Sequence, residues 1–343
     1  MEVGRLRRRA TIARKGIAQI LETAAAASGR PPHLLEKDVW VVWILSALFE
    51  SSLAEMLTFK GGTSLSKVYR VIDRFSEDID LTYDIRALLP DLVRDGPLPA
   101  TKSQAKKWTD TVRARLPEWI RAQVEPVVRG ALARDRIEAE VSVGGPDEDK
   151  LFVDYDPLRR GTGYVSPQVV LEFGARSTGE PHEHHTVRCD VAKHVPSVDF
   201  PVATALVMQV ARTFWEKATA AHVHCRQAKL RGERFSRHWY DLAQISKSSH
   251  FAAALRDRAV ALAVAEHKSW FFTEKDSSGA SIDYRSAVAG SLELVPLGEA
   301  RDALRADYSK MAEDGVLAIT PGFEELMETC GDVESRANEA VRQ

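Results

Sequence analysis

Hydrophobic and polar positions divide the chain into a half that predicts strands and a half that predicts helices. Short apolar runs and runs with period-2 alternation predict strands at residues 56–59, 78–82, 137–143, 151–155, 168–175 and 186–191. Later in the chain, the pattern predicts helices at residues 203–221, 236–250, 253–266, 285–289, 298–313 and 323–340. The change near residues 196–201 predicts an N-terminal domain at 1–198 and a helical domain at 199–343. The combination indicates an α+β fold.

Two helices are expected before the first strand, at residues 5–28 and 33–53. Gly29, Pro31 and Pro32 separate them, because glycine and proline interrupt helices. The second has an apolar stripe at helical spacing, which we expect to be buried: Val39, Trp40, Trp43, Ile44, Leu48 and Phe49. A short helix is expected at residues 63–71. Residues 87–135 predict a loop and then a solvent-exposed helix with charges of both signs.

Composition adds limits to this picture. The 343 residues are 44% hydrophobic and 28% charged with a net charge of -2, which is typical of a soluble globular protein. The three cysteines are far apart and form no CxxC pair, so neither a disulfide framework nor a cysteine zinc site is predicted. No apolar run reaches the roughly 18 residues of a membrane-spanning helix. The simplest interpretation is a cytoplasmic protein.

The stretch at residues 59–81 carries the first candidate chemistry. A turn at Gly61 and Gly62 opens into a hydroxyl-rich helix start at Thr63 and Ser64. The first N–H groups of a helix have no partner within the helix and bind phosphate well. We therefore expect these four residues to seat phosphates, with Lys67 also contacting the nucleotide.

Two aspartates follow in a short apolar run. In a strand, Asp78 and Asp80 would project to one face while Ile79 and Leu81 face the core. Paired carboxylates suit Mg²⁺ or Mn²⁺, since magnesium binds one or two carboxylates together with substrate phosphates. Asp78 comes sixteen residues after Gly62, enough for a turn, a helix and the next strand. The spacing predicts a metal–nucleotide site.

Three further side chains, Glu172, Ser76 and Arg74, extend the prediction of a metal–nucleotide site. Glu172 lies on the face of its strand opposite Leu171 and Phe173, and is the candidate for a third metal carboxylate; a salt-bridged strand glutamate is the alternative. Ser76 is expected to contact the nucleotide. Arg74 could also touch the nucleotide, and both Ser76 and Arg74 could instead cap or pair with neighbouring groups.

A basic stretch in the second half provides the second constellation. From Arg212 to Arg237 there are seven lysines or arginines and two glutamates, which suits a localised anionic partner. The excess of positive charge favours contact of Lys217 with a triphosphate or with RNA phosphates. Asp241, 24 residues later, would position Lys217 or a substrate hydroxyl. Arg237 can meet Asp241 on one helix face and is expected to contact the nucleotide. A solvated helical lysine is the alternative for Lys217.

Two further groups stay open at this point. Lys229, Arg231 and Arg234 could hold phosphate from a loop. Phe271 and Phe272 beside Lys268 could stack on a nucleic-acid end, and core packing is the alternative.

Gly-Gly-Thr-Ser-Leu at residues 61–65 and Arg-Phe-Ser-Glu-Asp-Ile-Asp-Leu at residues 74–81 resemble the AbiEii/MenT-type nucleotidyltransferase toxins of bacterial toxin–antitoxin and abortive-infection systems. The resemblance implies a polymerase-β-like core, a mixed sheet with flanking helices, and a helical C-terminal domain. It implies transfer of a nucleoside monophosphate from an NTP to the 3′ end of tRNA. Pyrophosphate is then released, and we expect Lys217 to neutralise the charge that develops on it. The resemblance also implies a cognate antitoxin, an AbiEi-like winged-helix regulator.

Other functions remain open from the sequence. The acceptor could be a protein hydroxyl, as in AMPylation, or a small molecule such as an aminoglycoside. A third possibility is a non-catalytic module that binds RNA or an antitoxin. The presence of both Asp78 and Asp80 favours catalysis over that third possibility.

Overall fold

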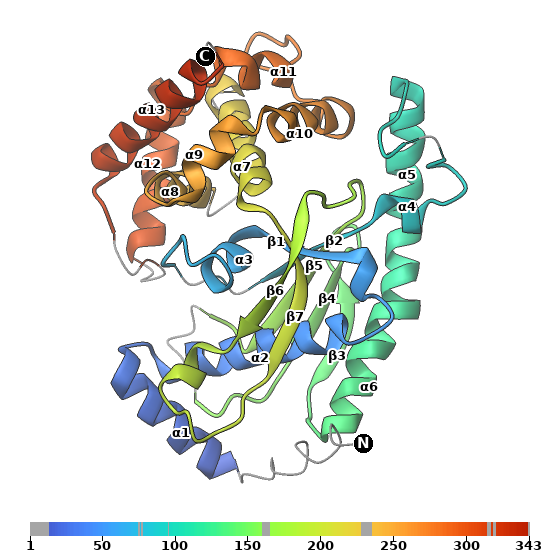
Figure 1. Cartoon of the computed structure of the whole chain (residues 1–343), viewed down its shortest axis with the longest axis vertical. Coiled ribbons are helices and arrows are strands. Elements are labelled where there is room, and N and C mark those ends of the chain that lie inside the picture. Colours follow the sequence, from blue (N-terminus) through green and yellow to red (C-terminus); the bar gives the residue numbers. More distant parts are fainter. Residues whose placement is uncertain are drawn as a thin grey trace.

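The computed structural model describes residues 14–74, 76, 78–94, 96–159, 165–227, 235–313, 317 and 320–341. It confirms the α+β class. Figure 1 shows a twisted sheet with helices along it and a group of helices, α7 to α13, gathered at one end. The predicted phosphate-holding residues Lys229, Arg231 and Arg234 lie outside the described residues.

The strands of the described chain form one mixed sheet of seven, in the order β3-β4-β5-β2-β1-β7-β6. Their bounds are β1 (Leu57–Lys60), β2 (Ile79–Tyr83), β3 (Glu140–Gly144), β4 (Lys150–Asp154), β5 (Gln168–Gly174), β6 (His182–Arg188) and β7 (Val202–Met208). At the centre, β2 pairs antiparallel with β1 and parallel with β5. The predicted strands are present, with ends shifted by a few residues.

Strand β7 corrects the prediction for the second half. Its residues were predicted to begin a helix at 203–221, but they lie between β1 and β6, and α7 starts only at Val210. A short apolar run cannot be assigned to strand or helix by periodicity alone. Here pairing on both sides and packing under α2 decide for a strand. The change from strands to helices therefore falls after Met208, and the division at 198/199 remains a prediction.

Helices surround the sheet and build the second half. The first half contains α1 (Arg14–Ser28), α2 (Pro32–Phe49), α3 (Gly61–Lys67), α4 (Ile85–Leu88), α5 (Lys102–Trp119), a π-helical turn η3 (Ile120–Val124), α6 (Glu125–Asp135), and the 3₁₀ turns η2 (Ala54–Met56) and η4 (Asp190–Lys193). The second contains α7 (Val210–Gln227), α8 (Arg237–Ser246), α9 (His250–Arg256), α10 (Arg258–Phe271), α11 (Tyr284–Ser286), a π-helical turn η5 (Ala287–Ser291), α12 (Gly298–Glu313) and α13 (Phe323–Glu339). None of the described helices combines the length and apolar composition needed to cross a bilayer.

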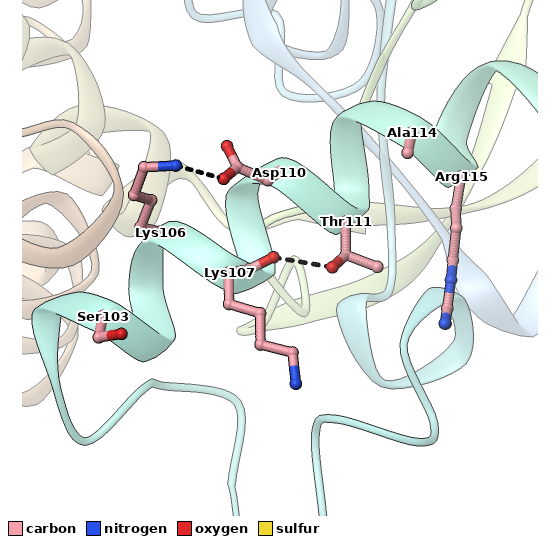
Figure 2. A pocket seen from close by; sticks show the side chains of 7 residues that line it. All are labelled: Ser103, Lys106, Lys107, Asp110, Thr111, Ala114 and Arg115. Carbon is pink, nitrogen blue, oxygen red and sulfur yellow. Dashed lines mark hydrogen bonds and ion pairs between the residues drawn. The ribbon is translucent and has the colours of Figure 1, made fainter.

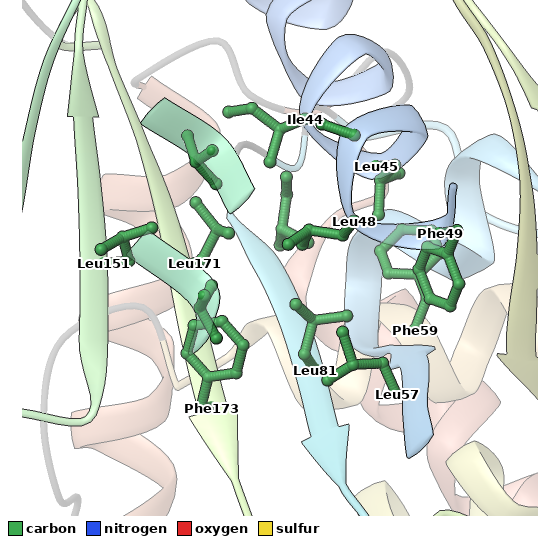
Figure 3. Close-up of a cluster of buried hydrophobic side chains, with 14 of the residues drawn as sticks. Ile44, Leu45, Leu48, Phe49, Leu57, Phe59, Leu81, Leu151, Leu171 and Phe173 are labelled. Carbon is green, nitrogen blue, oxygen red and sulfur yellow. The ribbon is translucent and has the colours of Figure 1, made fainter. Parts of the chain in front are cut away.

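The main core lies between α2 and one face of the sheet. Figure 3 shows Ile44, Leu45 and Leu48 of α2 over Phe59 and Leu81 of the central strands. The predicted apolar stripe of α2 is buried, apart from its half-buried first two members. The helix that was predicted to be solvent-exposed is α5, and the structure differs from that prediction. One face of α5 is buried in this core through Trp108, Val112 and Leu116.

Alternation along the strands sends a charged row to the opposite face. Register aligns Lys60 of β1 with Asp80 of β2, Asp80 with Glu172 of β5, and Glu172 with Lys150 of β4. Since side chains of paired residues share a face, these four project together, away from α2.

A second core fills the helical half. Its largest buried side chains include Phe214, Trp215 and Trp239, and it also contains Leu65 of α3 and Ile72 of the following loop. The N-terminal half therefore contributes apolar side chains to the core of the C-terminal half, which ties the stretch at 61–78 to both.

A buried ion network includes Lys67, which was predicted to contact the nucleotide. Its ammonium at the end of α3 pairs with Asp38 of α2 and, at 3.0 Å, with Asp190 of η4. The Asp190 backbone N–H also donates to Asp38 at 2.6 Å. Lys67 is not among the residues that line the nearby cavity. The charge of Lys67 therefore holds α2, α3 and η4 together, and its contact with a nucleotide remains a prediction.

Replacing Lys67 tests this network. Lys67→Met leaves the Asp38 carboxylate buried without its cation, so we expect unfolding free energy to fall by about 3–5 kcal/mol in urea denaturation. The matched control is Lys106→Met, because Lys106 pairs with Asp110 on the surface, where the two side chains are 78% and 52% exposed. Equal urea midpoints for the two variants would contradict the assignment.

Candidate active site

A cavity of about 370 Å³ lies between the charged face of the sheet and the helical half. It is lined by eight of the residues that the sequence predicted to act together: Gly61, Gly62, Ser76, Asp78, Asp80, Glu172, Lys217 and Arg237. Residues far apart in the chain thus meet in one place. Asp241, which was also predicted, does not line the cavity. Its carboxylate lies behind Lys217, 2.8 Å from the lysine ammonium.

Another depression is shallow and lies on a single helix. Figure 2 shows it along α5, with Lys106 paired to Asp110. Arg115 there pairs with Asp91 at 2.5 Å. Neighbouring carboxylates already hold these cations, so the depression has the character of a solvated helix face.

The acidic pair lies at the sheet end of the cavity. Asp80 lies in β2 between Lys60 and Glu172. Burial raises the pKa of the Asp80 carboxyl, and the negative charge of Glu172 adds to this, whereas Lys60, Lys217 and Arg237 oppose it. A buried carboxylate beside a like charge is an unfavourable arrangement that a bound cation relieves.

The Gly-Gly turn packs directly against these groups. Gly61 has a φ of 80°, and an added Cβ would lie 2.0 Å from the Asp80 Oδ2 atom. An added Cβ at Gly62 would lie 2.3 Å from the Nη2 atom of Arg74. Glycine favours the left-handed backbone at residue 61, and at both positions the absence of a side chain permits the close approach.

Thr63 and Ser64 lie beneath the turn and do not line the cavity. The Thr63 hydroxyl donates to the Asp78 carbonyl oxygen at 2.5 Å and is hydrogen-bonded to the Ser76 hydroxyl at 2.9 Å. The Ser64 hydroxyl donates to the Gly61 carbonyl oxygen at 3.0 Å. These side chains therefore position the turn and the acidic segment, and the seating of phosphates by residues 61–64 remains a prediction.

Glu172 departs from its predicted role as a third metal ligand. Its carboxylate pairs with Lys150 of the adjacent strand. Within the described residues no group of three or more His, Cys, Asp or Glu side chains is placed to hold a metal ion. The salt-bridged alternative is the one observed, because strand register puts Lys150 opposite Glu172.

Asp241 joins the two halves behind the cavity. Its fully buried carboxylate accepts from Nε and Nη2 of Arg74 at 2.7 and 2.8 Å, and lies 2.8 Å from the Lys217 ammonium. Burial alone would raise the pKa of Asp241, but the two cations outweigh it and hold the pKa well below its usual range. The predicted positioning of Lys217 by Asp241 matches this geometry. Arg74 forms an ion pair with Asp241, and pairing was one of the alternatives predicted for it.

Sequence reasoning missed Lys60 and His238, which line the cavity, and left the role of Lys268 open. Lys268 donates to the Glu216 carbonyl oxygen at 2.9 Å, and burial lowers the pKa of its ammonium to about 8 against the raising effect of the Glu216 carboxylate. The His238 Nδ1 atom is buried without a hydrogen-bond partner in the described structure. The sequence signals were the neighbours of each: Arg237 and Asp241 for His238, and Phe271–Phe272 for Lys268.

Comparison with known proteins identifies one family. A family profile described as "Nucleotidyl transferase AbiEii toxin, Type IV TA system" matches residues 43–329. The structure of MenT4, a nucleotidyltransferase toxin from Mycobacterium tuberculosis H37Rv, is similar with a TM-score of 0.45 and 18% sequence identity, over 96% of this chain and 88% of that chain. No curated protein sequence matches the chain.

Replacing Gly61 tests the close approach to Asp80. Gly61→Ala should lower the unfolding free energy by about 1–3 kcal/mol, because it adds a strained backbone and a steric clash. Gly29→Ala is the matched control: Gly29 has a φ of 73° with nothing within 4 Å of an added Cβ, so it carries only the backbone strain.

The contact with Asp80 is isolated by a double-mutant cycle. Gly61→Ala should cost less stability when combined with Asp80→Ala, since that change removes the clashing carboxylate. A cost that is unchanged in the double variant would contradict the contact.

The lowered pKa of Lys268 predicts pH-dependent binding of polyanions. Below about pH 8 the ammonium is charged and attracts phosphate. Affinity for inorganic tripolyphosphate, measured by calorimetry, should therefore fall as pH rises from 7 to 9. Lys268→Arg should flatten this profile, since guanidinium stays charged throughout. An equally steep profile in that variant would assign the pH dependence to another group.

Proposed function

This chain belongs to the AbiEii family of nucleotidyltransferase toxins of type IV toxin–antitoxin systems, and we propose that it transfers a nucleoside monophosphate from an NTP to the 3′ end of a tRNA, releasing pyrophosphate. The observation that carries this proposal is the single cavity in which the acidic pair, the glycine turn and Lys217 come together. We place the reaction in the cytoplasm, where both substrates are present.

The residues at the sheet end fit a divalent cation. Asp78 and Asp80 line the same cavity, and desolvation, together with the nearby charge of Glu172, raises the pKa of Asp80 in spite of the surrounding cations. Two carboxylates with substrate phosphates are the usual donor set for Mg²⁺ in phosphoryl transfer, and Mn²⁺ accepts similar ligands. When bound there, the cation would supply charge to the triphosphate and lower the pKa of the attacking hydroxyl.

Protein groups on the other wall act on the phosphates. Lys217, held by Asp241, is positioned to neutralise charge that develops on pyrophosphate as it leaves. Lys268 and Arg237 line the same cavity and add positive charge. The backbone at Gly61 and Gly62 lies open to the cavity and offers N–H groups to a phosphate.

The rigid backing of these groups supports catalysis over passive binding. Thr63 fixes Asp78 by its carbonyl oxygen, and Arg74 fixes Asp241 by a two-point contact. Reacting groups held in this way lose little entropy when substrate binds. We further propose a cognate antitoxin, an AbiEi-like regulator encoded beside this chain, as the partner that limits the activity.

Asp80→Asn tests the function and separates it from folding. Removing the charge should abolish nucleotide transfer and growth inhibition. Because the folded-state pKa of Asp80 is raised, its charged form opposes folding at neutral pH, so the variant should be at least as stable as the wild type. Thermal melts check stability, and transfer of labelled nucleotide checks activity. Unimpaired transfer by a folded Asp80→Asn protein would overturn the assignment. The matched control is Asp110→Asn on the exposed face of α5, which should leave transfer unchanged.

The acceptor is tested with the wild-type protein, labelled NTPs and Mg²⁺. Label should appear in the tRNA fraction of total RNA, and periodate oxidation of the tRNA 3′ end should prevent it. Label in total protein would indicate AMPylation, and label in neither would favour a small-molecule acceptor or a binding module.

A further inference from the structure

Part of the cavity extends beyond the groups assigned to phosphate and metal. Along β5, Glu172 and Gly174 point to the cavity side, and Arg176 lines the cavity just after the strand ends. Gly174 is in register with Thr82, two pairs further along the sheet than Asp80 and on the same face. An added Cβ at Gly174 would meet only the Leu81 carbonyl oxygen, at 3.9 Å. The floor between the acidic pair and Arg176 is therefore open.

A guanidinium and an aromatic ring form the far wall. The Cζ atom of Arg176 lies 4.4 Å from the ring centroid of Phe272, and the backbone of each is held. His267 is hydrogen-bonded to the Arg176 carbonyl oxygen at 2.8 Å, and the Tyr284 hydroxyl donates to the Phe272 carbonyl oxygen at 2.6 Å. The neighbouring Phe271 is buried, whereas Phe272 is 39% exposed and lines the cavity.

Within the described part of the chain, Arg176 lacks the carboxylate partner that a partly buried arginine ordinarily has. Among the described residues it makes no ion pair, and its guanidinium donates only to the Phe271 carbonyl oxygen, at 3.4 Å. Burial lowers its pKa and the charge of Arg113 adds to this, whereas the carboxylates of Asp147 and Asp149 act in the opposite direction without forming an ion pair with it in the described structure. A partly buried guanidinium without a carboxylate is unfavourable unless a ligand completes its surroundings.

Another arginine–phenylalanine stack in the chain shows the difference. Arg305 lies over Phe323, also 4.4 Å from the ring centroid, but its guanidinium pairs with Glu324 at 2.6 Å. That stack is outside the cavity. Among the stacks of the described residues, the one at Phe272 combines an unpaired guanidinium, an exposed ring and a cavity wall.

We propose that Phe272 and Arg176 form a platform on which a nucleobase stacks. Unstacked bases are bound by aromatic rings and by arginine planes, and such stacking tolerates any base because every base has a π-face. The inference rests on the proposed function. The base belongs either to the NTP or to the terminal nucleotide of the acceptor, both of which must reach the acidic pair across the open floor.

The first experiment compares ligands with and without a base. Calorimetry measures binding of ATP, GTP, CTP and UTP, and of inorganic tripolyphosphate, to the full chain with Mg²⁺. Phe272→Ala should weaken binding of the base-bearing ligand by about 5- to 150-fold. Tripolyphosphate binding should change by less than twofold, because it has no base to stack. Phe272→Trp should retain affinity.

A second pair of variants separates stacking from charge and from general surface effects. Arg176→Lys keeps the charge but loses the plane, so it should weaken the same ligand as Phe272→Ala does. Phe323→Ala removes the same type of stack outside the cavity and should leave all affinities unchanged.

A short single-stranded RNA with a free 3′ end is the other probe. Weaker NTP binding by Phe272→Ala with unchanged RNA binding would assign the platform to the NTP base, and the reverse would assign it to the acceptor. Unchanged affinity for both, or an equal loss for tripolyphosphate, would overturn the platform. If the wild type binds these ligands through Phe272 but transfers no nucleotide, the proposed function fails while the platform stands.

Discussion

The buried carboxylate of Asp241 is the contact on which the site depends. It lies between Arg74, which leads into the acidic segment of the first half, and Lys217, which comes from the first helix of the second half. Removing one partner of such a buried group leaves an unpaired charge, so the contact favours a single arrangement of the two halves. That arrangement places the lysine ammonium opposite the acidic pair. The cavity is therefore a product of docking between the halves.

Strand alternation supplies the other constraint. The sheet turns Phe59 and Leu81 toward α2 and, by the same period, turns Lys60 and Asp80 toward the cavity. One face stabilises the fold by apolar burial, and the other holds the partly buried carboxylate of Asp80, whose pKa is raised chiefly by desolvation. The site thus retains an arrangement that costs stability, as expected where a charged ligand is to be bound.

Several residues that sequence patterns assigned to the nucleotide support the site from behind. Lys67 belongs to an ion network under α2, and the Thr63 hydroxyl holds the backbone of Asp78. Residue type and spacing cannot separate a group that touches a ligand from one that positions its neighbour, because both need polar side chains close to the site. The same limit applies to Glu172, since its partner Lys150 is known only from strand register.

The sequence by itself determined the α+β class, the local unit of glycine turn, short helix and acidic strand, and the family, because these depend on contacts between residues close in the chain. Tertiary structure decided the rest. It made residues 202–208 a strand, since pairing with β1 and β6 outweighs an ambiguous apolar run. It also buried Phe271 while leaving Phe272 exposed, and it placed the guanidinium of Arg176 over the ring of Phe272. Those outcomes depend on which segments pack together over long separations, and no local pattern records that.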